Sequence, residues 1–268
     1  MNRVISLQEM DDEKMYVLEY EHDGTPFPSI FVTQFTDIFH GNKIDLDGKK
    51  ILLIQECLFE ISHMMADLEK IYFEYISLIN MFENDKGIGK VVRYEAGGYR
   101  FKSPDKRFRK LFKDYMLQIV SVYRESTKLL ESYTGNKYDC NNKVIKKVMD
   151  EKLVGSVAYD RLLKRLGFIK EIYDLRGILE HSEPQISKFR ISTVSNSLTF
   201  DYPKVKVKSK EYLLHDYMKQ NLTEMILFVQ DFAAAVIVKH KRPGIIINSS
   251  MDPNAYPNYW IPMPTFND

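Results

Sequence analysis

The stretch that decides the fold is residues 51–82, ILLIQECLFEISHMMADLEKIYFEYISLINMF. Its apolar residues recur at alternating spacings of four and three, which keeps their side chains on one face of an α-helix. We therefore expect one long amphipathic helix, packed along its length against other helices. Asp47 is suited to cap the start of this helix, and residues 84–89 end it. The apolar face consists of Ile54, Leu58, Ile61, Met65, Leu68, Tyr72, Tyr75 and Ile79.

Three further long segments show the same periodicity, and a shorter one lies between the first two of them. The segment that follows Ser103-Pro104, a capping residue and a proline at the first helical position, ends at Gly135-Asn136. Four long amphipathic helices in succession predict an all-α fold, an antiparallel four-helix bundle. The expected helices after the first cover about residues 104–134, 142–152, 157–181 and 209–241.

Two short segments are predicted to form β-hairpins inserted between the helices. In residues 189–202, apolar and polar residues alternate on both sides of a Ser195-Asn196-Ser197 turn. A second hairpin is expected at residues 90–102, around Gly97-Gly98.

These expectations divide the chain into three parts. The helical bundle covers residues 47–241 and contains a hairpin insertion at about residues 186–208. An acidic segment, residues 1–46, is expected to pack on the bundle. Residues 242–268 form a tail rich in proline and aromatic residues.

Charge is distributed unevenly along a chain whose net charge is +1. Residues 1–47 carry ten acidic and three basic side chains, whereas residues 86–113 carry ten basic and two acidic ones. Residues 136–170 add nine basic and four acidic side chains. Clustered lysine and arginine can bind a polyanion by releasing counterions from its phosphates, and they can equally neutralise an acidic part of the same protein. Charge alone leaves both interpretations open.

The composition and the cysteine count exclude several classes of protein. With 44% hydrophobic and 28% charged residues, the chain resembles a folded globular protein, not a disordered or fibrous one. Two cysteines cannot form a disulfide framework or a four-thiolate zinc site. The first residues lack the apolar core of a secretory signal, and the longest clean apolar run, residues 232–238, is too short to span a bilayer. We expect a cytoplasmic protein with no membrane partner.

A metal centre of the di-iron type is not expected. Such a centre needs two Glu-x-x-His motifs on facing helices, and Glu60-x-x-His63 has no second copy. Glu211 and His215 have the wrong spacing. The sequence therefore predicts neither a metal site nor another cofactor.

The end of the helix at residues 157–181 carries the candidate chemistry. Arg176 falls in the middle of an apolar helix face, where a guanidinium needs an anion, a protein partner or a route to water. His181 falls in the last turn, where the helix dipole favours the imidazolium. An arginine that holds a phosphate and a histidine that transfers protons suit phosphodiester cleavage. Alternatively, His181 bonds a free helix carbonyl and Arg176 extends its guanidinium to water.

The segment Arg176-Gly-Ile-Leu-Glu-His181, at the end of the third long helix, resembles the Arg-x4–6-His motif of the HEPN superfamily. Members with this motif are typically metal-independent endoribonucleases of toxin–antitoxin, abortive-infection and CRISPR defence systems. They dimerise so that two Arg–His pairs line one cleft. The resemblance implies that Arg176 positions the scissile phosphate and that His181 is the acid and base for attack by the 2′-hydroxyl. The products would be a 2′,3′-cyclic phosphate and a 5′-hydroxyl.

The chain departs from this family in one residue. Many members place Asn, Asp or His directly after the arginine, whereas this chain has Gly177. By position, Glu180 or Ser182 can substitute as a supporting residue. The basic stretch at residues 86–113 is expected to guide RNA toward the cleft. The hairpin at residues 189–202, which begins eight residues after His181, is expected to rim or gate the cleft. The expected phosphate contacts are Lys106, Arg107, Arg109 and Lys110.

Together, these features predict a HEPN-like homodimer that cleaves single-stranded RNA in a defence or toxin–antitoxin system, with an antitoxin or other defence protein as a partner. A non-catalytic HEPN-like module that binds nucleotides or RNA, or acts as a scaffold, is the main alternative. A third interpretation is an interaction protein unrelated to this family, which docks through its aromatic, proline-rich tail.

Overall fold

The computed structural model describes the helical part of the chain and several short strands. The described residues are 2–4, 20–22, 45–84, 92–95, 98–101, 103–137, 142–153, 157–181, 186–194, 197–207, 209–240, 248–249 and 259–260. Side chains are described at residues 45–84, 103–137, 145–153, 158–172, 174, 177, 186–192, 199–207 and 209–240.

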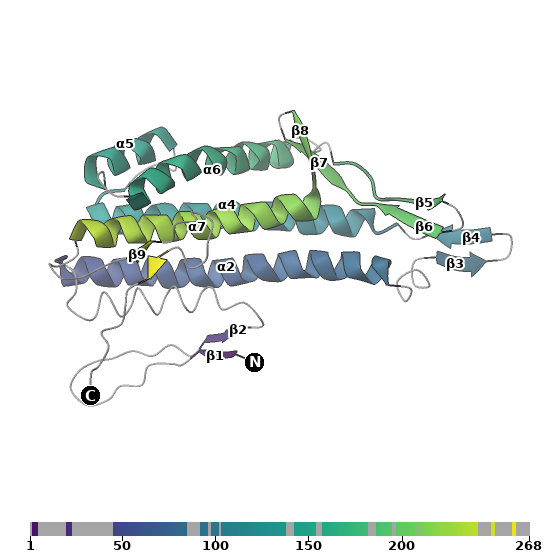
Figure 1. Ribbon diagram of the computed structural model, residues 1–268, viewed down its shortest axis with the longest axis horizontal. Helices are drawn as coiled ribbons and strands as arrows, with labels where there is room; N and C mark the ends of the chain where they lie inside the picture. Colours follow the sequence, from purple (N-terminus) through teal and green to yellow (C-terminus); the bar gives the residue numbers. More distant parts are fainter. Residues whose placement is uncertain are drawn as a thin grey trace. The chain divides into compact units, whose positions relative to one another are not determined.

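Helices account for most of the described residues (Figure 1). They are α2 (Gly48–Glu83), α4 (Asp105–Thr134), α5 (Asn142–Lys152), α6 (Val157–His181) and α7 (Leu214–His240). The prediction of a largely helical fold is confirmed, and α5 and α6 have the bounds expected from periodicity. Of the eight positions on the predicted apolar face of α2, seven are buried, and Tyr72 is half-buried.

The predicted ends of α2 and α4 are confirmed by their capping contacts. Asp47 Oδ1 accepts hydrogen bonds from the Lys49 and Lys50 amides at 3.0 and 3.2 Å, so it satisfies two donors of the first turn. Ser103 Oγ accepts a hydrogen bond from the amide of Asp105 at 3.3 Å. At the other end of α4, Gly135 has a φ of 81°, the left-handed conformation in which glycine commonly ends a helix.

The described strands form antiparallel pairs of two. Both predicted hairpins are confirmed, one as β3 and β4 and the other as β5 and β6. The pairs are β1 (Asn2–Val4) with β2 (Tyr20–His22), β3 (Val92–Glu95) with β4 (Gly98–Phe101), β5 (Arg190–Val194) with β6 (Ser197–Asp201), β7 (Lys204–Val207) with β8 (Lys210–Leu213), and β9 (Asn248–Ser249) with β10 (Tyr259–Trp260).

The pair β7–β8 corrects one expectation. A helix was expected from about residue 209, but residues 210–213 form β8, and α7 begins at Leu214. The reason is pairing with another strand. Strand β8 pairs along its length with β7, and the Leu214 amide donates to the Pro203 carbonyl at 3.0 Å. Pairing with a neighbouring strand overrides the helical preference of these residues.

The chain divides into two compact units, and each long helix contributes to both. Unit 1 contains residues 1–66, 124–166 and 226–268. Unit 2 contains residues 67–123 and 167–225.

In unit 1, polar contacts join helices through an apolar core. The Cys57 thiol of α2 lies 3.3 Å from the Ser132 hydroxyl of α4. Arg165 of α6 donates from Nε to Asp231 Oδ2 of α7 at 2.7 Å, and the two side chains are only 8% and 0% exposed. Helix α6 is therefore joined to α7 by a buried ion pair.

The end of α7 is joined to two other segments of unit 1. The Tyr133 hydroxyl of α4 lies 2.8 Å from His240 Nε2, and the Asp45 amide donates to the His240 carbonyl at 2.7 Å. Burial lowers the pKa of His240 below its ordinary value, so the neutral imidazole is favoured.

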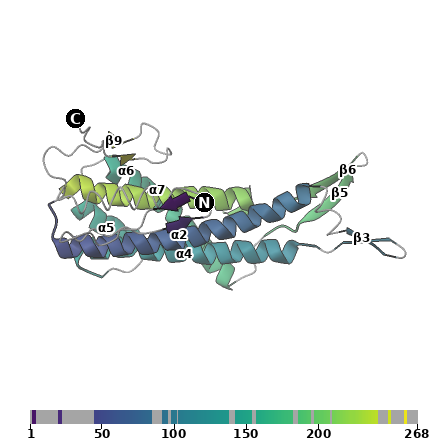
Figure 2. The same cartoon turned by 90° about the horizontal axis from the view of Figure 1, so that it is seen from below.

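In unit 2, α4 contacts both α2 and α7. The first turn of α4 meets the C-terminal half of α2, where Arg107 donates to Glu74 at 3.0 Å, so these helices run antiparallel (Figure 2). The Tyr115 hydroxyl of α4 donates to the Met218 carbonyl of α7 at 2.6 Å in the buried interior. The hairpins β3–β4, β5–β6 and β7–β8 also belong to unit 2.

Candidate functional site

Helix α6 carries both candidate catalytic positions, Arg176 and His181, in its last two turns. Its backbone continues to His181, as the periodicity predicts. The side chains of Arg176, Glu180 and His181, and the whole of Ser182, lie outside the described residues. The roles assigned to these four residues therefore stay predictions.

The backbone of α6 places positions 176 and 181 on different faces of the helix. At about 100° per residue, Arg176 falls about 20° from Ile169, which is 1% exposed. His181 falls about 20° from Asp174, whose side chain is exposed. The two candidate positions are thus about 140° apart around the axis. The expectation of a dimer stays a prediction.

Gly177, the departure from the family motif, lies next to Arg176 on the helix. A Cβ added at this residue would meet nothing within 4 Å. The backbone there is helical, so an alanine methyl group fits at this position. The glycine is not required by packing.

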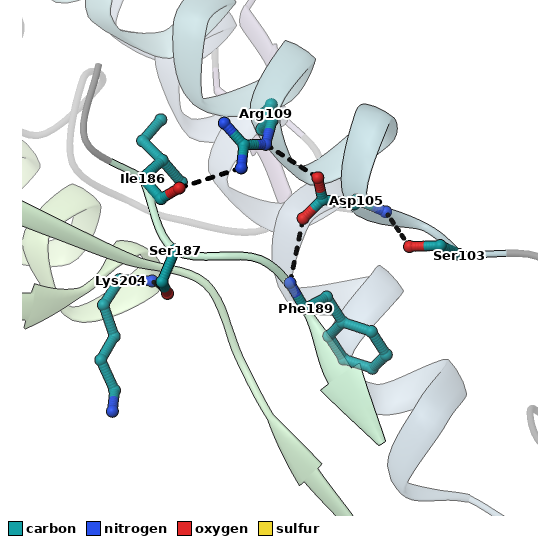
Figure 3. Close-up of polar contacts among 7 residues, drawn as sticks. All are labelled: Ser103, Asp105, Arg109, Ile186, Ser187, Phe189 and Lys204. Atoms are coloured by element: carbon teal, nitrogen blue, oxygen red, sulfur yellow. Dashed lines mark hydrogen bonds and ion pairs between the residues drawn. The ribbon is translucent and has the colours of Figure 1, made fainter. Parts of the chain in front are cut away.

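Residues 186–189 are held against the first turn of α4 by a polar clamp (Figure 3), which we define as Asp105 and Arg109 with the backbone that they bind. Arg109 donates from Nε to Asp105 Oδ2 at 2.8 Å and from Nη2 to the Ile186 carbonyl at 2.9 Å. The Phe189 amide donates to Asp105 Oδ1 at 2.9 Å. Asp105 and Arg109 are 19% and 30% exposed, so water shields the pair only in part. The clamp fixes residues 186–189 on α4.

Strand β7 binds the same segment through its backbone. The Ser187 amide donates to the Lys204 carbonyl at 2.9 Å, and the Lys204 amide donates to Ser187 Oγ at 2.8 Å. Ile186 forms an isolated antiparallel bridge with Val205, and both side chains are buried. Residues 186–189 therefore have polar partners on both α4 and β7.

Aromatic side chains pack beneath the base of hairpin β5–β6. Phe189 lies 5.5 Å from Phe108 of α4 and 5.1 Å from Phe82 of α2, measured between ring centroids. Phe200 and Tyr202 lie 6.0 and 5.6 Å from Phe189. Offset ring contacts of this kind stabilise a cluster beyond the apolar area that they bury. The inner face of the hairpin is therefore anchored on two helices.

Tyr202 adds a polar contact at the edge of this cluster. Its hydroxyl donates to Glu83 Oε1 of α2 at 3.2 Å. Burial, with the charge of Glu83, raises the pKa of Tyr202 well above its ordinary value. The phenol therefore stays protonated and continues to donate at neutral and alkaline pH.

The four basic residues expected to contact RNA differ in their surroundings. Lys106 and Lys110 are exposed on α4. Arg107 forms an exposed ion pair with Glu74, and Arg109 belongs to the clamp. Their contacts with RNA stay a prediction.

Sequence reasoning assigned no role to Asp105, and it gave Arg109 only a role in RNA contact. A local signal was present, because Asp105 and Arg109 are four residues apart at a helix start, a spacing that favours an ion pair. The backbone groups that these side chains bind could not be predicted from local spacing, since Ile186 is 77 residues from Arg109 and Phe189 is 84 residues from Asp105.

Glu60 and His63, considered for a metal centre, both lie exposed on α2. Among the described residues, no group of three or more His, Cys, Asp or Glu side chains could hold a metal ion.

Of the described helices, α7 is long and apolar enough to span a membrane, with a mean hydropathy of 1.5 in its most apolar window. In that window, 78% of the residues are buried inside the protein. A buried core helix passes the same test, so localisation stays a prediction.

No family model, curated protein or solved structure matches the chain. Its fold is that of a largely helical protein with small antiparallel hairpins.

Proposed function

We propose that this protein is a metal-independent endoribonuclease of the HEPN type, which cleaves single-stranded RNA at a site shared by two copies of the chain. The observation that carries the proposal is the clamp between α4 and residues 186–189. It fixes residues 186–189, which begin five residues after His181, on the helix start that bears Lys106 and Lys110.

The length of the chain limits the distance between these features. Ile186 follows His181 by five residues, so their Cα atoms are at most about 18 Å apart. Arg109 donates directly to the Ile186 carbonyl, and Lys110 is the next residue of α4. Exposed cations thus lie within the span of a short RNA segment from the candidate histidine, and lysines near a phosphate backbone favour binding of RNA irrespective of sequence.

In the proposed reaction, Arg176 binds the scissile phosphate and stabilises the charge that develops on its oxygens. His181 removes the proton from the 2′-hydroxyl as that oxygen forms a bond to phosphorus. The bond from phosphorus to the 5′-oxygen breaks, and the departing oxygen takes up a proton from the imidazolium. A 2′,3′-cyclic phosphate and a 5′-hydroxyl result, with no net oxidation and no metal required.

The proposal includes a homodimer because positions 176 and 181 lie on different faces of α6. A two-fold axis beside the helix end can bring a residue of one copy opposite the complementary residue of the other. Each copy then completes the partner's site, and activity depends on association.

The test is cleavage of labelled single-stranded RNA in excess EDTA by wild type, Arg176→Ala and His181→Ala. We expect each substitution to reduce cleavage by at least a hundredfold, since a general acid–base group commonly contributes 10²–10⁴-fold. Exposed residues on other helices provide matched controls, Arg124→Ala and His63→Ala, which should retain wild-type activity. Cleavage that survives both of the first substitutions overturns the proposal.

A second assay follows the expected role in defence or as a toxin. Overexpression of wild type should stop bacterial growth, whereas His181→Ala should not. If an intact dimer cleaves no RNA and binds it with equal affinity in both forms, the protein is the alternative, a non-catalytic RNA-binding or scaffold module.

A further inference from the structure

We propose that Asp105 is a positioning residue, which acts with Arg109 to hold residues 186–189, between α6 and hairpin β5–β6, in one fixed arrangement. The catalytic consequence rests on the proposed function, whereas the contact itself can be tested without any activity.

The two side chains of the clamp divide their hydrogen bonds between each other and the backbone. Asp105 uses Oδ2 for Arg109 and Oδ1 for the Phe189 amide, at 2.8 and 2.9 Å. Arg109 uses Nε for Asp105 and Nη2 for the Ile186 carbonyl, at 2.8 and 2.9 Å. The pair therefore satisfies one backbone donor and one backbone acceptor that lie three residues apart. Such charge-assisted bonds are stronger than neutral ones, and partial burial limits their screening.

The short segment of residues 186–189 has several anchors. Within residues 186–189, the clamp binds both ends, β7 binds Ser187, and the Phe189 ring enters the aromatic cluster. Strand β5 begins at the next residue, Arg190. The hairpin thus starts from a fixed base, and we expect it to act as a rigid rim, not as a moving gate.

The fixed segment lies close in sequence to the candidate histidine. Four residues separate His181 from Ile186, so the clamp keeps the Cα atom of His181 within about 18 Å of a segment that is fixed on α4. Proton transfer requires hydrogen-bond distances between the acid or base and the substrate, and small displacements reduce the rate strongly. Loss of the clamp should therefore lower kcat, while RNA binding through exposed lysines persists.

Amide hydrogen exchange tests the contact directly. In wild type, the Phe189 amide should exchange slowly, because it is bonded to a partly buried carboxylate. Asp105→Ala should accelerate its exchange at least tenfold and should also accelerate exchange in β5 and β6. Asp105→Asn retains one oxygen acceptor and should have a smaller effect. The matched control is Ser103→Ala, which removes a bond at the same helix start without touching residues 186–189.

Two outcomes would overturn the contact. One is equal exchange at Phe189 in Asp105→Ala and wild type, and the other is an equal acceleration in Ser103→Ala. If Asp105→Ala does not fold, Arg109→Lys provides the same test, since a lysine retains the charge but lacks the planar fork that binds Asp105 and Ile186 together.

Kinetics on RNA test the positioning role. Asp105→Ala should lower kcat at least tenfold and change KM less than twofold, whereas Lys106→Ala should mainly raise KM. Faster exchange at Phe189 with unchanged kcat overturns the positioning role. If wild type cleaves no RNA, the proposed function fails, and the exchange result still decides whether the clamp exists.

Discussion

The buried ion pair between Arg165 and Asp231 gives the sharpest prediction about stability. The perturbation is Arg165→Met, which keeps a long apolar side chain at this position and removes the guanidinium. Asp231 is 0% exposed, so its carboxylate would then remain inside the protein without the guanidinium that faces it at 2.7 Å. The variant isolates the effect of removing the guanidinium from a buried carboxylate.

The magnitude follows from the geometry of the pair. At 2.7 Å and an effective dielectric constant of about 20, two unit charges attract each other by about 6 kcal/mol. Desolvation of both groups offsets much of this attraction in the intact protein. Removing one partner keeps the desolvation cost of the other, and such changes typically lower the free energy of unfolding by about 3–5 kcal/mol. The double variant Arg165→Met with Asp231→Leu should lose much less, since it buries no charge.

The assay is urea denaturation followed by circular dichroism, with the free energy of unfolding taken from the midpoint and slope. The matched control is Lys70→Met, which breaks an exposed ion pair with Asp67 and should cost less than about 1 kcal/mol. A cost for Arg165→Met no larger than that of the control would refute the reasoning. A double variant less stable than Arg165→Met would also refute it.

Three further predictions concern single contacts. Burial lowers the pKa of His240 in the folded protein below 6.5, the ordinary value expected in the unfolded chain. Between these two pKa values the unfolded state binds more protons than the folded state. The free energy of unfolding should therefore rise with pH across that window and level off above it. Urea midpoints from pH 5 to 8 should show this rise in wild type and a smaller one in His240→Gln, and equal slopes would contradict it. Gly177→Ala should raise the free energy of unfolding by about 0.5–1 kcal/mol, since the added methyl group meets open space on a helix, and a lower melting temperature would contradict it. Asp47→Ala should lower the free energy of unfolding by about 1 kcal/mol, because two capping bonds are lost. Asp45→Ala keeps its backbone bond to His240 and should cost less. Equal losses in the two variants would exclude the cap.

The helices could be predicted from sequence because their determinants are local. Apolar spacing along residues 51–82 and 157–181 identifies α2 and α6, and capping residues such as Asp47 and Ser103 mark where helices begin. Each of these signals acts over a few residues, so a single sequence contains it in full.

Strand β8 shows where local signals fail. Residues 210–213 suit a helix, yet they pair with β7 in an arrangement that the spacing of their own side chains does not encode. Hairpin β5–β6 could be predicted, since alternating apolar and polar residues and a Ser-Asn-Ser turn occur together in its sequence.

The polar contacts around the candidate site show a second limit. Asp105 and Arg109 are four residues apart on one helix, but their backbone partners lie 84 and 77 residues later in the chain. Arg165 and Asp231 likewise belong to separate helices. A sequence gives the chemical type of such side chains, whereas their partners follow from the packing of the whole chain.

The measurement closest to the central claim is the chemistry of the RNA ends. Single-stranded RNA is incubated with the wild-type protein in excess EDTA, and the fragments are analysed by mass spectrometry. Attack by the 2′-hydroxyl predicts fragments that end in a 2′,3′-cyclic phosphate and begin with a 5′-hydroxyl. Fragments with a 3′-hydroxyl and a 5′-phosphate, or cleavage only after Mg²⁺ is restored, would contradict the account.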